Sequence, residues 1–145
     1  MNTNIQICLI EDDKADYLLF KNYLNKINNN YDLEWFDSYE TGLDAIIERR
    51  HDIYFVDYTL GAETGINLIH RALENNNMAP FIMLTGSDDP ELYKKLSKSG
   101  VQDYVLKGEL SSSMIDRCVT YSLERQRIEN DLRKEKEFTS NIIRE

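Results

Sequence analysis

The chain has 145 residues, 41% hydrophobic and 30% charged, which is the size and composition of a single soluble globular domain. Its net charge of −9 disfavours nucleic-acid binding, which normally needs a basic surface. The N-terminus lacks the pattern of a signal peptide, and no apolar run is long enough to span a membrane. We therefore expect a cytoplasmic protein that makes no contact with a membrane.

Five short apolar segments alternate with five segments of helical periodicity. The predicted strands are residues 5–10, 32–36, 53–57, 81–85 and 103–106. The predicted helices are residues 14–28, about 39–50, about 65–75, about 90–97, and a last helix that opens at Ser111. Ser38 is placed to cap the second helix, and Asp88 or Asp89 to cap the fourth.

The alternation of apolar strands with helices predicts an α/β fold, with a parallel sheet that is covered by helices on both faces. For five strands we expect the flavodoxin-like order 2-1-3-4-5, in which the first and third strands are neighbours. The first strand, "IQICLI", is followed by Glu11 and Asp12, and the third, "IYFVD", ends in Asp57. These three carboxylates should therefore converge at the carboxyl edge of the sheet.

The last helix is predicted to be longer than a globular domain needs, because no Gly or Pro interrupts the chain after Gly108. Residues 1–123 carry 11 basic and 20 acidic residues, whereas residues 124–145 carry six of each. Opposite charges at helical spacing support an exposed helix, as in Arg125–Glu129, Arg127–Asp131, Glu129–Arg133 and Arg133–Glu137. We interpret 124–145 as a helical linker that extends the last helix of a domain spanning 1–123. A merely solvated helix is the alternative, and homodimerisation through the weak heptads stays open.

A cluster of carboxylates at strand ends needs a cation, and oxygen ligands without His or Cys favour Mg²⁺. Asp57 itself can attack phosphorus and form an aspartyl phosphate. The fourth strand places the Thr85 hydroxyl beside this site and is followed by Gly86, which would allow a close backbone approach. Lys107 follows the fifth strand and could pair with Asp57 and then with a bound phosphoryl group.

The cysteines and histidines predict no further site. Cys8 lies in an apolar strand and Cys118 in a helical pattern, so we interpret both as buried structural thiols. His51 and His70 have no second ligand at the spacing of a zinc site.

Acids after the first and third strands, a hydroxyl after the fourth and a lysine after the fifth resemble the receiver domain of two-component response regulators, over about residues 5–123. The resemblance implies that Asp57 is the phosphoacceptor. It also implies a phosphohistidine donor, which is a histidine kinase or a histidine phosphotransfer protein. A downstream output domain, PAS-like or a kinase, would follow the linker. The expected role is a signalling switch, with self-phosphorylation and self-dephosphorylation as its only chemistry.

The resemblance also assigns roles to the neighbouring residues. The implied Mg²⁺ ligands are Asp12 and Asp57 directly, Glu11 through water, and the backbone carbonyl of Thr59. The implied contacts of the phosphoryl group are Thr85, Gly86 and Lys107. Tyr104 matches the aromatic switch that moves with Thr85, while Thr59 and Ser87 match the positions that tune the lifetime of the aspartyl phosphate.

One position departs from the family pattern. Receivers usually have Lys-Pro with a cis peptide bond after the fifth strand, and this chain has Lys107-Gly108, for which we assume no cis bond. This departure keeps one alternative open, a degenerate receiver that only docks partners. A phosphatase of the haloacid-dehalogenase type would need a second aspartate where this chain has Thr59. A flavin-binding module would need a phosphate loop where this chain has "EDDKAD".

Overall fold

A five-stranded parallel sheet forms the centre of the protein. The computed structural model describes residues 4–27, 30–86, 90–99 and 101–144, of which 140–144 are described as backbone only. The sheet strands are β1 (Ile5–Ile10), β2 (Tyr31–Phe36), β3 (Ile53–Asp57), β6 (Phe81–Thr85) and β7 (Asp103–Leu106). Their order is β2-β1-β3-β6-β7, which is the predicted 2-1-3-4-5 arrangement of sheet strands.

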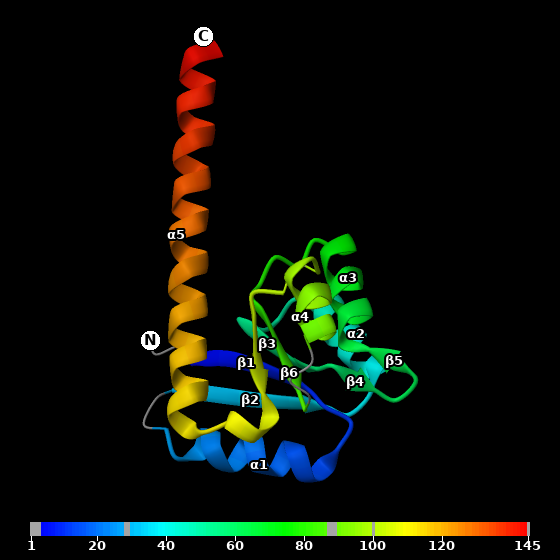
Figure 1. The fold of residues 1–145 in the computed structure, drawn as a ribbon. Helices are drawn as coiled ribbons and strands as arrows, with labels where there is room; N and C mark the ends of the chain where they lie inside the picture. Colours follow the sequence, from blue (N-terminus) through cyan, green and yellow to red (C-terminus); the bar gives the residue numbers. More distant parts are fainter. Residues whose placement is uncertain (1–3, 28–29, 87–89, 100, 145) are drawn as a thin grey trace.

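Helices cover both faces of this sheet (Figure 1). They are α1 (Lys14–Asn25), α2 (Tyr39–Glu48), α3 (Gly65–Glu74), α4 (Pro90–Ser97), the short 3₁₀ turn η1 (Lys107–Glu109) and α5 (Ser112–Arg144). Alternate strand residues point to opposite faces, so Ile7 and Leu9 pack with α1 and α5, while Cys8 and Ile10 pack with α2, α3 and α4. The predicted α/β fold is confirmed.

Local hydrogen bonds set most of the helix boundaries. The Asp13 side chain accepts hydrogen bonds from two backbone N–H groups of the first turn of α1, and Ser38 caps α2 as predicted. The Ser111 hydroxyl accepts a hydrogen bond from the Met114 N–H, so α5 begins one residue later than predicted. Helix α1 ends at Asn25 instead of residue 28. The predicted caps Asp88 and Asp89 lie outside the described residues.

A small hairpin that the sequence analysis did not predict follows Asp57 directly. It consists of β4 (Thr59–Leu60) and β5 (Glu63–Thr64), which pair antiparallel. Its turn contains Gly61 at φ +63°, in the left-handed region that glycine adopts without strain. The hairpin lies beside the carboxyl edge of the sheet and so forms part of the surroundings of Asp57.

Helix α5 extends far beyond the rest of the molecule (Figure 1). Of the ion pairs predicted along its 33 residues, the structure confirms Arg125–Glu129 and Arg127–Asp131 at 3.2 Å each. Arg133 instead donates a hydrogen bond to the Asn130 side chain. Where α5 leaves the body, the Gln126 side chain donates a hydrogen bond to the Met78 carbonyl. Within the described residues, no helix has the length and apolar character needed to cross a bilayer.

The two cysteines differ in their surroundings. Cys8 is fully buried in the sheet, as predicted, and burial raises the pKa of its thiol. Cys118 is only partly buried, so the prediction of a second fully buried thiol is wrong. The reason is that Val119 occupies the side of α5 that faces the sheet, while the neighbouring Cys118 packs only against the edge of that core cluster.

Candidate functional site

Three carboxylates meet at the carboxyl edge of the sheet, as the strand order requires. Glu11 and Asp12 follow β1, and Asp57 ends the neighbouring strand β3. One ligand oxygen from each of the three residues lies within 4.8 Å of the other two. Glu11 and Asp57 are buried, whereas Asp12 is exposed. A cluster of oxygen ligands without His or Cys suits a hard divalent cation such as Mg²⁺.

Hydrogen bonds hold each acid in place. The Asp12 carboxylate accepts from the N–H of Gly61, in the turn of the β4–β5 hairpin, at 3.1 Å. The Asp57 carboxylate accepts from the Thr59 N–H at 3.4 Å. The indole of Trp35 donates to the backbone carbonyl of Glu11 at 2.7 Å, and its ring stacks on Tyr17 of α1. The positions of all three acids therefore depend on residues next to the sheet edge.

Glu11 has an unusual protonation equilibrium. Only 1% of its surface is exposed, and burial raises its pKa to about 8, with a hydrogen bond to Asp57 as the second cause. A neutral Glu11 relieves the repulsion between these carboxylates in the metal-free protein. A cation in the cluster would favour the ionised form.

Lys107 joins these acids from the end of β7, as predicted. Its ammonium nitrogen lies 3.2 Å from Asp57 Oδ2 and 2.8 Å from Glu11 Oε1. A third carboxylate, Asp16 of α1, lies closer still, at 2.7 Å. Burial disfavours the charged form of Lys107, but the hydrogen bonds to Asp16 and Glu11 and the charge of Asp57 outweigh this effect and raise its pKa.

Two side chains at this edge were missed by the sequence analysis. Asp16 is separated from Lys107 by 91 residues along the chain, so no local spacing predicts their contact. The only local signal was that Asp16 lies in the first turn of a helix that follows the acids. No pattern in the sequence indicates the hydrogen bond that the Trp35 side chain donates to the Glu11 carbonyl.

Beside Asp57 the surface is hollowed into a cleft of about 390 Å³. Its lining includes Thr59 and Thr85, and on the α4 side the exposed Lys95, which the sequence analysis had not singled out. Gly86 also lines the cleft, but a Cβ added there meets no atom within 4 Å. The protein's own packing therefore leaves space at this position, and the close approach of the Gly86 backbone to a phosphoryl group stays a prediction. Ser87 lies outside the described residues.

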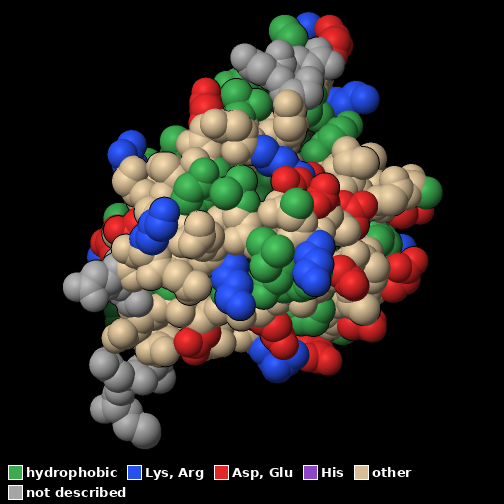
Figure 2. All heavy atoms as spheres, turned by 90° about the horizontal axis from the view of Figure 1, so that it is seen from below, with side chains coloured by type: hydrophobic (Ala, Val, Ile, Leu, Met, Phe, Trp, Pro, Cys, Tyr) green, Lys and Arg blue, Asp and Glu red, His purple; other side chains and the backbone are tan. Residues whose placement is uncertain are grey.

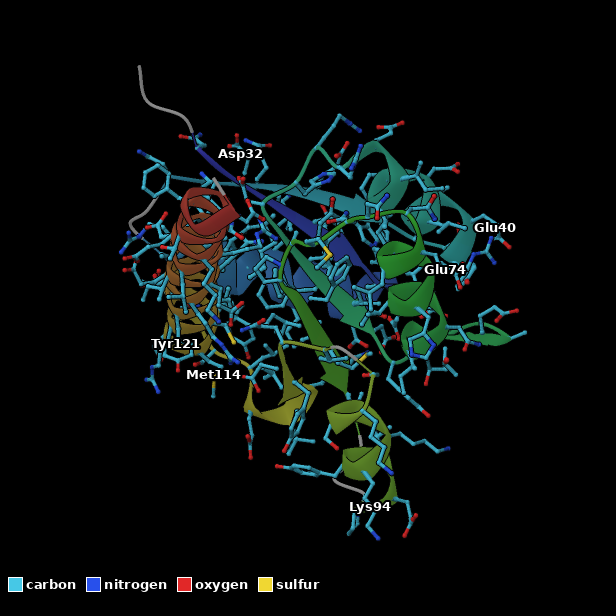
Figure 3. The ribbon with its side chains drawn as sticks, turned by 90° about the horizontal axis from the view of Figure 1, so that it is seen from above. Asp32, Glu40, Glu74, Lys94, Met114 and Tyr121 are labelled. Carbon is cyan, nitrogen blue, oxygen red and sulfur yellow. The ribbon has the colours of Figure 1, made fainter. Side chains whose placement is uncertain are left out.

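Tyr104 lies on β7, away from the acids. Its half-buried ring meets the ring of Tyr93 on α4 edge-on, with 4.5 Å between ring centroids. The two tyrosines, with Met114 and Cys118 of α5, line a second hollow of about 460 Å³. Met114 and Tyr121 lie on the side of α5 toward β7 and α4 (Figure 3). The inward movement of Tyr104 stays a prediction.

The loop after β7 has the backbone geometry assumed from the sequence. The Lys107–Gly108 peptide bond is trans, and Lys107–Glu109 form the 3₁₀ turn η1. Gly108 has no positive φ, and a Cβ added to it meets no atom within 4 Å. Glycine is therefore not required here by close packing, and its effect is to leave the loop backbone freer.

Comparisons with known proteins agree with this geometry. The family model for the response regulator receiver domain matches residues 7–118. The transcriptional regulatory protein QseB of Haemophilus influenzae is 28% identical over 103 residues, which are 71% of this chain and 46% of QseB. MalR of Bacillus subtilis is 23% identical over 103 residues, which are 71% of this chain and 44% of MalR. The chain thus spans less than half the length that these relatives have.

Solved structures share the fold. The signal receiver domain of an HD domain-containing protein from Pseudomonas fluorescens has a TM-score of 0.77 at 20% identity, over 90% of this chain and 95% of that one. The receiver domain of a sensor histidine kinase from Pseudomonas aeruginosa, solved with a magnesium ion in its active-site cleft, has a TM-score of 0.72 at 18% identity, over 84% of this chain and 99% of that one. The match over residues 7–118 shows that the chain belongs to the response regulator receiver domain family of two-component signalling.

Proposed function

We propose that Asp57 accepts a phosphoryl group from a phosphohistidine of a histidine kinase or a histidine phosphotransfer protein. The observation that carries the proposal is the environment of Asp57, which is a buried carboxylate at a strand end beside an open cleft. Lys107 lies within hydrogen-bond distance of it, and two further acids are close by. A solvated strand end would have no such surroundings.

Glu11, Asp12 and Asp57, together with the Thr59 backbone carbonyl, would hold Mg²⁺. The fit rests on the chemistry of the donors, which are three carboxylates close enough together to share one ion. Bound there, the cation would offset the repulsion between the carboxylates and an incoming phosphoryl group. With such an ion bound, the ionised form of Glu11 would be favoured, and its carboxylate, now 2.8 Å from the Lys107 nitrogen, would serve as one of the donors.

The chemical step is a direct transfer. An oxygen of Asp57 forms a bond to phosphorus while the bond between phosphorus and the donor imidazole nitrogen breaks, and the electron pair returns to the imidazole. The Lys107 ammonium group, now in an ion pair with the Asp57 carboxylate, would then contact a phosphoryl oxygen, and the Thr85 hydroxyl and the Gly86 backbone would approach another. Thr59 lines the cleft beside Asp57, and at this position, together with Ser87 as predicted from the sequence, it would tune the lifetime of the aspartyl phosphate.

The donor would approach over α1. This helix begins next to the acidic cluster, and its outer surface exposes Leu18 and Leu19. Figure 2 shows hydrophobic, basic and acidic side chains interspersed on the face that α1 covers. Two exposed leucines beside the phosphorylation site are suited to a protein partner that must bring a histidine to Asp57.

The output would leave through α5. Movement of Thr85 toward the phosphoryl group would let Tyr104 turn inward and separate from Tyr93, which changes the surface between α4, β7 and α5. Residues 124–145 would act as a helical linker from the receiver, residues 1–123, to an output domain that is PAS-like or a kinase. A homodimer through the exposed side of α5 is compatible with Ile128 and Leu132, which are 54% and 52% exposed.

Intact mass after incubation with acetyl phosphate tests the proposal. We expect one phosphoryl adduct in the presence of Mg²⁺, and none with a chelator or in the Asp57→Asn variant. An adduct of equal yield in Asp57→Asn would refute Asp57 as the acceptor. No adduct under any condition would instead support a receiver that only docks partners.

A further inference from the structure

The Lys107 ammonium group contacts more acids than its role at Asp57 requires. Its nitrogen lies within 3.2 Å of carboxylate oxygens of Asp16, Glu11 and Asp57. The contact with Asp16 is a hydrogen bond at 2.7 Å, the shortest of the three, although an ammonium group has donors enough for all of them. Glu11 and Asp57 belong to the cluster that would hold the cation, whereas Asp16 lies outside that cluster, on α1.

Packing alone does not hold Lys107 in place. The residue opens the turn η1, where the next position, Gly108, carries no side chain and has open space around it. A cavity of about 210 Å³ lies next to the Lys107 side chain, and its lining includes Leu19 and Leu110. The lysine therefore has room to turn away from Asp57, and its position depends on its charged partners.

Asp16, in contrast, is held on a rigid element. It lies in the first turn of α1, where its own N–H donates to the capping carboxylate of Asp13. The helix is fixed to the sheet by Phe20, which is 1% exposed. The Asp16 carboxylate is thus a fixed point 2.7 Å from the Lys107 nitrogen.

We propose that Asp16 is a positioning residue that keeps the Lys107 ammonium group at the phosphorylation site. The inference rests on the proposed function. When Asp57 carries a phosphoryl group and Glu11 faces a cation, both acids change their interaction with Lys107, but Asp16 does not. Asp16 therefore retains one N–H donor of Lys107 and leaves the other two directed at the phosphoryl oxygens.

The test compares the wild type with Asp16→Asn, Asp16→Glu and the control Asp44→Asn, which removes the same charge from an exposed position on α2. With acetyl phosphate and Mg²⁺, we expect adduct formation in Asp16→Asn to be slower by about three- to fivefold, the effect of losing a partly exposed ion pair. Asp16→Glu should recover most of the rate, because it keeps the charge and the adjacent cavity has room for its longer side chain. Asp44→Asn should react like the wild type.

A second readout follows Lys107 directly. The ¹⁵N resonance of its ammonium group should be visible in the wild type, where the hydrogen bond to Asp16 and the ion pairs with Glu11 and Asp57 slow exchange with water. It should broaden in Asp16→Asn but not in Asp44→Asn. If wild type and Asp16→Asn give the same rate and the same resonance, Asp16 has no positioning role although Asp57 is phosphorylated. If the wild type itself gives no adduct, the proposed function fails, and the role of Asp16 fails with it.

Discussion

At the scale of single residues, the acidic cluster destabilises the folded state. Glu11 and Asp57 are buried near each other, and like charges in a buried site raise the free energy of the folded state. The ion pair with Lys107 offsets part of this cost. The raised pKa of Glu11 indicates that its ionised form is still disfavoured in the folded protein.

Without metal, the free energy of unfolding should depend on pH through Glu11. The pKa of Glu11 is about 8 in the folded protein against an ordinary value of 4.5, so between these pH values the folded state binds more protons than the unfolded state. The free energy of unfolding should therefore decrease as pH rises through this range. Glu11→Gln has no group to ionise, so its stability should decrease less and exceed that of the wild type near pH 8.

Urea denaturation in a chelator, at several pH values between 5 and about 8.5, measures this difference. Glu40→Gln is a matched control, because Glu40 is exposed on α2 and lies at the rim of the molecule (Figure 3). Identical pH slopes for wild type and Glu11→Gln would show that burial of Glu11 does not shift its titration.

A second residue-scale prediction concerns Gly65, the first residue of α3. A Cβ at this position would lie 2.5 Å from the backbone oxygen of Asp57 and 2.9 Å from the sulfur of Met83. Backbone cannot yield as a side chain can, so Gly65→Ala should destabilise the protein by about 1–3 kcal/mol and slow phosphorylation by displacing Asp57.

Gly108→Ala is the control, since a Cβ there meets no atom within 4 Å. Denaturant midpoints of the two variants measure the comparison. Equal midpoints would mean that the start of α3 moves away from β3 at little cost.

At the scale of elements, the two parts of α5 have different relations to the body. The first part buries Ile115 and Val119 completely against the sheet, whereas Ile128 and Leu132 in the second part are about half exposed. The ion pairs Arg125–Glu129 and Arg127–Asp131, near the Gln126–Met78 contact, join residues of the helix to one another and not to the body. The extension therefore adds length but little packing.

A chain that ends at Arg127 tests this difference. Its unfolding free energy should stay within about 0.5 kcal/mol of the full chain, because only exposed helix is removed. Ile115→Ala, at a fully buried position, should in contrast lose about 2–5 kcal/mol. Thermal unfolding monitored by circular dichroism gives both values, and a loss of similar size on truncation would contradict an independently exposed extension.

The strands and helices were predictable because their signals are local. Apolar runs alternate with amphipathic segments along the whole chain, and side chains such as Ser38 mark helix starts. The β4–β5 hairpin was missed because strands of two residues leave no periodicity to detect. Helix α1 was predicted too long because Ile27 follows Leu24 at helical spacing, although the helix ends at Asn25.

At the scale of the whole molecule, the candidate site was predictable as far as topology alone assembles it. Parallel strands bring their carboxyl ends to one edge, so Asp57, Glu11 and Lys107 could be placed together from the strand order. Asp16 and Trp35 reach the same edge through side-chain directions set by helix docking and strand pairing. No spacing of residues along the chain predicts where these two side chains point.

The course of α5 has a mechanical consequence. The helix starts five residues after Lys107, at the edge of the sheet that holds the acids, and passes Met78 near the opposite edge. The segment past Gln126 is about 27 Å long, so a tilt of about 5° there would move its end by about 2 Å. Because Ile115 and Val119 hold the first part of α5 on the sheet, such a displacement would arise from bending beyond the Gln126–Met78 contact and would be largest at the free end of the helix.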